Sequence, residues 1–429
     1  MILARLRSSP LGRAAGRTPT WAWVLAAGIG GCALLVTRQP HILINPQLWA
    51  EDGKVWYRDA YLHGPIRPLL WPYAGYLNTC QRLVGGLGLV VPIAVLPLFF
   101  ACADLVMQVL PVMFLATDRM CTVTSSRTIR VGIGLAGLAL PDLAELTGNV
   151  TNTQWSLAVL AALVLVARPA GSKAWRVFDV AVILIGGLSG PFSFFLAPEA
   201  MALAAIRRSR LQFTLAMLVC ATAATQATAL SLSAASQRPL LLGPFHLEAT
   251  AGAALVAGRM LLAPLAGASR GTAFAVAIGP WGDLAVSAIA TSLIATAMLQ
   301  SSTELRLLLC FGLLTLAGTL AGTRGLWIDM VRPAAAERYW YIPMLTWIVA
   351  LAVVAARHRR RWVRASALYA LLAVALVGIP SGWQYPAPAN AHFQEAASKF
   401  ATAPPGRAVT FQEDPPGWRF VLVKVRPTI

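Results

Sequence analysis

The chain has 429 residues, of which 57% are hydrophobic and only 12% are charged. Soluble domains carry about 25% charged residues, so this composition excludes a disordered chain and is not that of an ordinary cytosolic enzyme. The net charge of +18 comes from 35 Lys and Arg residues against 17 Asp and Glu residues. In a membrane protein such a basic excess reflects loop topology, so we expect no nucleic-acid partner.

Apolar stretches long enough for a membrane helix recur along the chain. They predict an all-α polytopic membrane protein with about eleven transmembrane helices, at 21–37, 99–117, 131–147, 154–168, 177–189, 191–205, 211–230, 283–299, 306–322, 340–356 and 365–381. Two further apolar segments, 83–97 and 247–266, are expected to lie as helices at the outer membrane interface. An additional span is the alternative for 83–97.

Basic residues gather in the loops that share one side of this topology. Nineteen Lys and Arg residues, but only Asp118 and Glu304 among the acids, fall in 1–20, 118–130, 168–176, 206–210, 300–306 and 357–364. Cytoplasmic loops are enriched in Lys and Arg, so the pattern predicts an N-terminus inside and a C-terminus outside. No convincing cleavage site follows the first apolar stretch, which we expect to remain as an uncleaved span.

This topology divides the chain into a transmembrane body, 1–381, and a small outer tail, 382–429. The substantial outer loops of the body are 38–82, 231–282 and 323–339. In the Pro-rich tail, alternating residues from Trp418 to Val425 predict a short strand packed on the body.

The first outer loop holds the densest cluster of charges. Glu51 and Asp52 are adjacent carboxylates beside the membrane. One can accept the proton of an attacking hydroxyl, while the other orients that hydroxyl or holds a divalent cation such as Mg²⁺ or Mn²⁺. Lys54 and Arg58 can keep a carboxylate ionised. The alternative is that both acids only cap the following helix.

Polar and aromatic residues further along the first outer loop and near three other span ends are candidates for substrate contacts. The set comprises Tyr73, Tyr76, Asn78, Glu145, Asn149, Asn152, Trp155, Ser189 and Tyr339. Aromatic rings suit sugars and lipid headgroups, but Tyr and Trp also line any membrane interface. The stretch with Asn149 and Asn152 is equally compatible with a capped polar turn, and Ser189 with a tight helical hairpin.

Arginines at the membrane boundary are candidates for holding a lipid phosphate. Arg338 precedes the tenth predicted span, and Arg324, Arg58 and Arg82 lie in the outer loops. A guanidinium can hold a phosphate with two parallel hydrogen bonds. It can also simply extend to the aqueous interface without a ligand.

The order of these short motifs resembles the GT-C-type polytopic membrane glycosyltransferases, and in particular a loosely characterised bacterial group of them. The motifs are Ala50-Glu51-Asp52-Gly53, Pro72-Tyr73-Ala74-Gly75-Tyr76-Leu77, Asn149 to Trp155, Leu188-Ser189-Gly190-Pro191, Arg338-Tyr339 and Pro416-Gly417-Trp418. The resemblance implies a polyprenyl-phosphate-linked sugar donor and an inverting transfer with an acidic general base, Asp52 or Glu51. Many relatives have a large outer carbohydrate-binding domain, whereas this chain has only the small tail.

We therefore expect sugar transfer to a cell-envelope glycan, a glycolipid or a protein at the outer face of a bacterial inner membrane. Arg338, with Arg324, Arg58 or Arg82, would hold the donor phosphate. One alternative is a flippase or transporter of lipid-linked sugars, which would show mid-span charges and repeated halves. The other is a polysaccharide polymerase or ligase that uses basic residues of the 231–282 loop.

Overall fold

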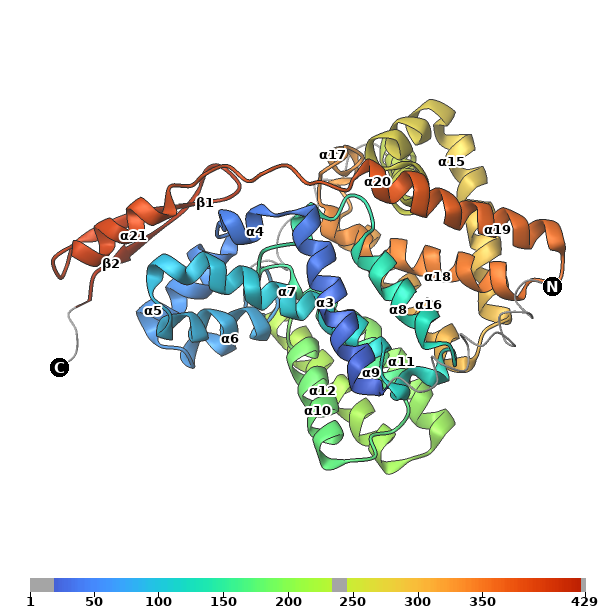
Figure 1. Cartoon of the computed structure of the whole chain (residues 1–429), viewed down its shortest axis with the longest axis horizontal. Coiled ribbons are helices and arrows are strands. Elements are labelled where there is room, and N and C mark those ends of the chain that lie inside the picture. Colours follow the sequence, from blue (N-terminus) through green and yellow to red (C-terminus); the bar gives the residue numbers. More distant parts are fainter. Residues whose placement is uncertain (1–18, 234–244, 426–429) are drawn as a thin grey trace.

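The computed structural model describes residues 19–233 and 245–425, and this part of the chain is mostly helical (Figure 1). Eight helical stretches in it are long and apolar enough to cross a membrane: Thr20–Arg38, Ile93–Leu115, Arg210–Ser231, Leu247–Ala266, Ala268–Leu299, Thr303–Gly322, Glu337–Arg357 and Arg361–Ser381. The expectation of a helical multi-pass membrane protein is therefore confirmed.

The bundle contains a helix at each position where a span was predicted. These helices are α3 (Thr20–Arg38), α7 (Leu96–Leu115), α8 (Arg127–Leu138), α9 (Thr153–Val166), α10 (Lys173–Gly187), α11 (Ser193–Arg207), α12 (Arg210–Ser231), α15 (Ala268–Leu299), α16 (Thr303–Gly322), α18 (Tyr341–Arg357) and α19 (Arg361–Ala373), which continues into α20 (Ile379–Ser381). Four of them, α8 to α11, have only 12, 14, 15 and 15 residues, and about 20 are needed to span a bilayer. The count of eleven spans stays a prediction.

The segment 131–147 departs most from its predicted span. Helix α8 ends at Leu138, and the chain then turns at Pro141 and Asp142. Proline disfavours a helical conformation in the residue before it, and Asp142 has a left-handed φ of 62°. The remaining residues of the segment form a loop with one 3₁₀ turn, Ala144–Leu146, instead of continuing the α-helix.

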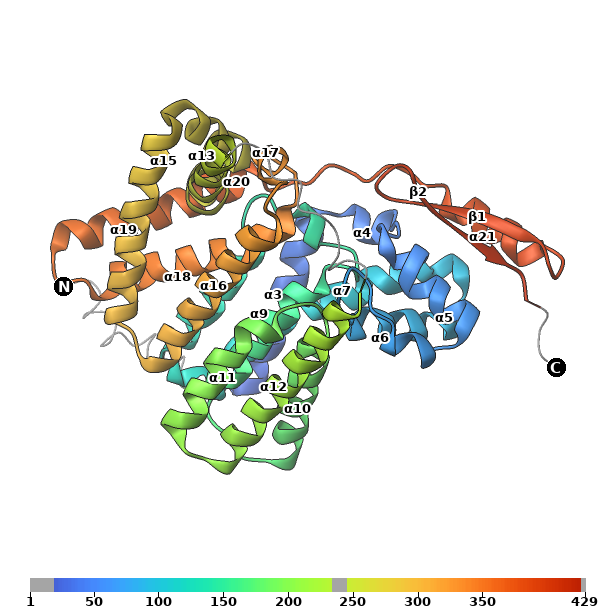
Figure 2. The same cartoon turned by 180° about the vertical axis from the view of Figure 1, so that it is seen from behind.

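Helix α9 forms the centre of the bundle. Every residue of α9 except Gln154 is buried, and the helix packs against α7, α10, α11 and α16 (Figure 2). A helix that is apolar on all sides is stable only when other helices enclose it. The N-terminus of α9 is thereby fixed, and with it the polar residues that precede the helix.

Several loops meet at the end of the bundle where α9 begins, here called the site end. These are the first loop, the segment before α9, the α10–α11 turn and the segment before α18. Gly190 donates its N–H to the Leu77 carbonyl at 3.0 Å, and the Gln226 amide bonds both loops. The basic loops meet at the opposite end, where Arg207 pairs with Glu304 and Arg357 bonds the Gln300 carbonyl.

The first loop contains short helices and one irregular turn. These are α4 (His41–Ile44), a π-helical turn (Asp52–Tyr57), α5 (Arg58–His63) and α6 (Thr79–Leu87). The segment 83–97 does not form one span, because the helix breaks at Pro92 between two 3₁₀ turns.

The second segment expected at the interface, 247–266, lies within a continuous helical stretch. It comprises α13 (Phe245–Leu255), a π-helical turn (Val256–Leu262) and α14 (Ala263–Ala266). It contacts α17 (Trp327–Met330) at Gly252 and, at Pro264, the π-helical turn Val374–Gly378 that follows α19. The stretch Leu247–Ala266 is long and apolar enough to cross a membrane, so its placement at the interface stays a prediction.

The C-terminal tail folds as helix α21 (Phe393–Thr402) followed by an antiparallel hairpin of β1 (Ala408–Glu413) and β2 (Trp418–Val423). The predicted strand in 418–425 is confirmed, whereas the sequence analysis did not identify its partner β1. Phe411 and Phe420 stack across the hairpin with centroids 5.0 Å apart. Figure 1 shows the tail extended from α20 along the first loop, beside α4 and α5.

Candidate active site

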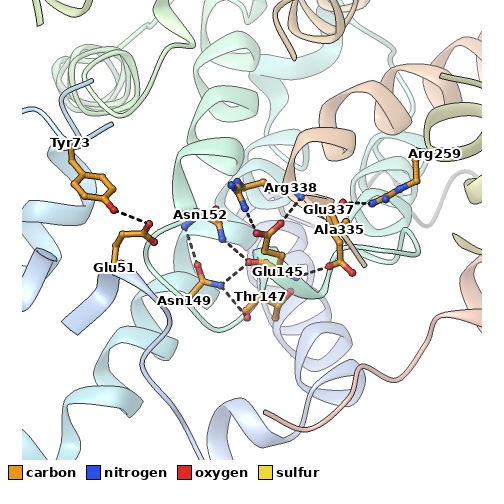
Figure 3. Close-up of polar contacts among 10 residues, drawn as sticks. All are labelled: Glu51, Tyr73, Glu145, Thr147, Asn149, Asn152, Arg259, Ala335, Glu337 and Arg338. Carbon is orange, nitrogen blue, oxygen red and sulfur yellow. Dashed lines mark hydrogen bonds and ion pairs between the residues drawn. The ribbon is translucent and has the colours of Figure 1, made fainter. Parts of the chain in front are cut away.

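Glu51 lies at the point where the first loop enters its π-helical turn. Ala50 before it has a left-handed φ of 45°, which turns the chain sharply. The Tyr73 hydroxyl donates a hydrogen bond to Glu51 Oε1 at 3.2 Å (Figure 3). Burial raises the pKa of Glu51 above its ordinary value, while the Tyr73 hydrogen bond and the nearby Arg338 guanidinium act in the opposite direction. Glu51 is thus a partly exposed carboxyl with enhanced proton affinity.

Asp52, the adjacent acid, has a different environment. Its side chain is fully buried, and Oδ1 accepts hydrogen bonds from the Thr151 amide at 3.0 Å and the Thr151 hydroxyl at 2.9 Å. Oδ2 accepts the Trp49 amide at 3.3 Å. Burial raises the pKa of Asp52 to about 7. Asp52 therefore ties the first loop to the segment that leads into α9.

Arg338 and Glu145 join the other two segments of the site. Their side chains form an ion pair, and Glu145 Oε2 also accepts the Arg338 backbone amide at 3.3 Å. In return, the Glu145 amide donates to Glu337 Oε2 at 2.7 Å (Figure 3). The Arg338 side chain remains 31% exposed and lies over the Tyr339 ring. It retains access to an anionic ligand.

The two predicted asparagines hold the backbone of this site. The side-chain amides of Asn149 and Asn152 donate to the Glu145 carbonyl at 2.8 and 2.7 Å. Both are buried, so they fix the loop that presents Glu145 rather than facing a ligand.

Aromatic rings form another part of the site. Trp155 packs edge-on against Tyr339 at 5.4 Å, and Tyr76 lies close enough to interact electrostatically with Tyr339. Tyr73 packs edge-on against Trp56, also at 5.4 Å. Aromatic rings therefore lie beside both charged groups. Tyr73 is next to Glu51, and Tyr339, with Tyr76 near it, is next to Arg338.

A buried ion pair supports the segment before α18. Arg259 pairs with Asp142, Nη2 to Oδ2 at 2.6 Å, and donates to the carbonyls of Met330 and Ala335 at 2.9 Å each. Asp142 and Glu337 also line a cavity of about 370 Å³, whose walls do not include Glu51 or Arg338. This structural role of Arg259 could not be predicted from the sequence, because the carbonyls that it bonds lie 71 and 76 residues further along the chain.

The other predicted arginines bond residues outside the group formed by Glu51, Tyr73, Glu145 and Arg338, or are exposed. Arg82 is buried, pairs with Asp59 at 3.0 Å and bonds the Trp71 carbonyl. Arg324 pairs with Glu248, and Arg58 is exposed on α5.

Asn78 and Ser189 are likewise structural. The Asn78 amide bonds the carbonyls of Tyr73 and Tyr76, and the Ser189 hydroxyl accepts the Cys80 amide at 2.9 Å. They hold the turn that carries the tyrosines.

A carboxylate that the sequence analysis did not identify reaches the acidic pair from the tail. Glu413 is buried, and its Oε2 accepts the Gly53 amide at 2.7 Å. Burial raises its pKa to about 8. Across residues 19–233 and 245–425, no three His, Cys, Asp or Glu side chains form a group suited to a metal ion.

The site thus combines a proton acceptor, a partly exposed cation and aromatic surfaces at one end of a helical bundle. Such a set can bind a polar group attached to a lipid and remove a proton from a second reactant. Comparisons of the chain with protein-family models, with curated proteins and with solved structures give no match.

Proposed function

We propose that the protein is a membrane glycosyltransferase that moves a sugar from a polyprenyl-phosphate donor to an acceptor hydroxyl. The acceptor is a cell-envelope glycan, a glycolipid or a protein. The observation that carries the proposal is that Glu51, bonded by Tyr73, and Arg338, paired with Glu145, lie at the same end of the bundle and interact electrostatically, which would give the site a base and a cation for a phosphate. The order of short motifs described above supports the same class.

Glu51 is the better candidate for the general base. Its carboxyl is partly exposed and has one hydrogen bond from Tyr73, whereas both oxygens of Asp52 are occupied inside the protein. Burial raises the proton affinity of Glu51, which favours proton transfer from a hydroxyl. Asp52 then serves to hold the loop.

The proposed reaction is a single displacement. Glu51 takes the acceptor proton as the acceptor oxygen attacks the anomeric carbon, and the bond from that carbon to the phosphate oxygen breaks. Polyprenyl phosphate leaves with the bonding electrons, and Arg338 stabilises its added negative charge. One displacement inverts the anomeric configuration. The residues of the first loop and the segment before α18 face the exterior or periplasmic side of a bacterial inner membrane in this proposal.

The test uses purified protein in lipid vesicles with radiolabelled polyprenyl-phosphate hexoses and pentoses and a cell-envelope fraction as acceptor. We expect Glu51→Gln to reduce transfer by about 10²- to 10⁴-fold, the usual contribution of a general base. Glu395→Gln, an exposed change on α21, is the matched control and should transfer normally. Full activity in Glu51→Gln would contradict the proposed base.

The same vesicles distinguish the alternative classes. Movement of intact lipid-linked sugar across the bilayer, without sugar transfer, would identify a flippase. Turnover only with diphosphate-linked donors would instead indicate a polymerase or ligase.

A further inference from the structure

The C-terminal tail contacts the backbone on both sides of Glu51. On one side, the Ala50 amide donates to the Asp414 carbonyl at 2.6 Å, and the Asp414 amide donates to the Leu48 carbonyl at 2.9 Å. On the other side, the Gly53 amide donates to Glu413 Oε2 at 2.7 Å. Two consecutive tail residues therefore fix the chain immediately before and after the candidate base.

Gly53 and the tail fit each other closely. A Cβ atom on Gly53 would lie 2.3 Å from Phe420 Cε1 and 2.5 Å from Glu413 Oε2. Real Cβ atoms do not approach that closely, so no other residue type permits this contact unchanged. Phe420 itself is buried and stacked on Phe411. The approach thus depends on a glycine in the first loop and on a rigid aromatic pair in the hairpin.

Further contacts dock the hairpin onto the same loop. Lys54 Nζ lies 4.6 Å from the centre of the Trp418 ring, and the Tyr61 hydroxyl donates to the Val423 carbonyl at 3.2 Å. The apolar core of this region joins first-loop residues such as Trp56 to tail residues such as Phe400. The hairpin is therefore held by a broad interface, within which Glu413 bonds the loop two residues after Glu51.

The hydrogen bond to Gly53 does not by itself explain why residue 413 is an acid. Its carboxyl interacts electrostatically with Asp52 and Glu51, so three acidic groups share one largely buried region. Grouping carboxyls in this way disfavours their ionisation, and a neutral amide would accept the Gly53 hydrogen bond without that penalty. The hydrogen bond alone therefore does not require an acid at this position.

We propose that Glu413 is a positioning residue and that the C-terminal hairpin clamps the turn at residues 49–53, so that Glu51 faces Tyr73 and Arg338. This inference rests on the proposed function of Glu51 as the base. In this chain the small tail completes the site, although it contributes no group to the reacting atoms.

The test compares four variants in lipid vesicles. Glu413→Ala removes the acceptor, Glu413→Gln keeps an acceptor oxygen without the charge, Gly53→Ala blocks the approach from the loop side, and Glu395→Gln is an exposed tail control. Two readouts are needed: amide hydrogen exchange of peptides covering 48–57, which does not depend on activity, and kcat and KM for sugar transfer.

We expect Glu413→Ala and Gly53→Ala to speed exchange in 49–53 and to lower kcat about tenfold, with little change in donor KM. Glu413→Gln should restore the exchange protection and most of kcat, and Glu395→Gln should match wild type. Unchanged exchange in both Glu413→Ala and Gly53→Ala would overturn the clamp. Faster exchange with wild-type kcat would overturn the positioning role and leave only a structural one.

The outcome for the wild-type protein separates this inference from the proposed function. Wild-type protein that transfers no sugar from any donor would overturn the proposed function and the positioning of a base with it. Exchange in the same samples would still decide whether the hairpin clamps the turn. Size-exclusion profiles and thermal unfolding of each variant identify any that fail to fold.

Discussion

Glu51 and Asp52 are adjacent in the chain but have different surroundings. Glu51 is partly exposed and meets Tyr73, while Asp52 is buried beneath Thr151. Their divergence follows from the left-handed turn at Ala50 and the π-helical turn that begins at Asp52, which direct consecutive side chains to different sides. From the sequence alone the choice of base between them stays open, because both side chains carry a carboxyl group and only the backbone geometry gives them different surroundings.

Docking of the tail should depend on pH through Glu413. Burial of its carboxyl in the docked tail raises the pKa to about 8, against an ordinary value of 4.5. The docked state therefore binds this proton more tightly than the released state, so docking is strongest below the ordinary value and weakens as pH rises through the raised one. The acidic groups that face Glu413 are Asp52 and Glu51 of the first loop.

We expect faster amide exchange in 49–53 at about pH 9 than at about pH 5, after correction for the intrinsic rate of exchange. Glu413→Gln should reduce this difference, since the neutral side chain no longer releases a proton. A constant protection across this range in the wild-type protein would contradict the prediction.

Arg338 should be more sensitive to substitution than other arginines at the site end. Arg338→Ala removes the exposed cation next to Glu51, and we expect transfer to fall by about 10²-fold or more, as when an electrostatic stabiliser is lost. Arg338→Lys should recover only part of the activity, because an ammonium group cannot form two parallel hydrogen bonds to a phosphate. The measurement is kcat/KM for the donor.

The control for this series is Arg407→Ala, an exposed change in the tail. Equal activity of Arg338→Ala and Arg407→Ala would exclude Arg338 from phosphate binding.

At the scale of elements, the π-helical turn that carries Asp52 is supported by α6. Gly85 of α6 touches it so closely that an added Cβ would lie 2.4 Å from the Trp56 carbonyl oxygen. Helix α6 is supported by the α10–α11 turn, because the Cys80 amide donates a hydrogen bond to the Ser189 hydroxyl. The site is therefore assembled from short elements that contact one another, rather than from a single rigid helix.

Gly85→Ala should displace this turn. We expect a loss of about 1–3 kcal/mol in the free energy of unfolding, typical of overpacking, together with reduced transfer. The matched control is Gly132→Ala on α8, where nothing lies within 4 Å of the added Cβ. There the stability should stay the same or increase slightly, because alanine favours helix. Thermal unfolding in detergent measures both, and equal unfolding temperatures would contradict the close contact.

At the scale of the whole molecule, the chain forms a helical membrane body with a small tail docked at one end. Arg38, at the end of α3, is fully buried and bonds the carbonyls of Leu138, Leu140 and Gly382. It thereby fixes the point at which the tail leaves the body. The site end and the basic loops lie at opposite ends of the bundle.

The charge distribution predicts that the tail is outside and the basic loops are inside. In a cysteine-free background, Ser398→Cys on α21 should react with a membrane-impermeant thiol reagent added to intact cells. Arg359→Cys, in the basic loop before α19, should react only after the membrane is permeabilised. The reverse pattern would invert the topology and place the proposed site on the cytoplasmic side.

The sequence by itself determined the helical membrane body. Apolar stretches must form helices in a bilayer because their backbone groups have no water to bond, so residues such as those of α9 could be assigned from composition alone. It also identified the polar segments around Glu51, Glu145 and Arg338. It did not establish the lengths of α8 to α11, because loops and short helices share the same apolar composition.

Only the tertiary structure decided which polar residues meet. Glu413 reaches Gly53 across 360 residues, and Arg259 crosses from one loop to another to bond Met330 and Ala335. Such contacts leave no periodic trace in the sequence, since they depend on how whole helices pack and not on local spacing. The fold class is thus set by local hydrophobicity, whereas the composition of the site is set by long-range packing.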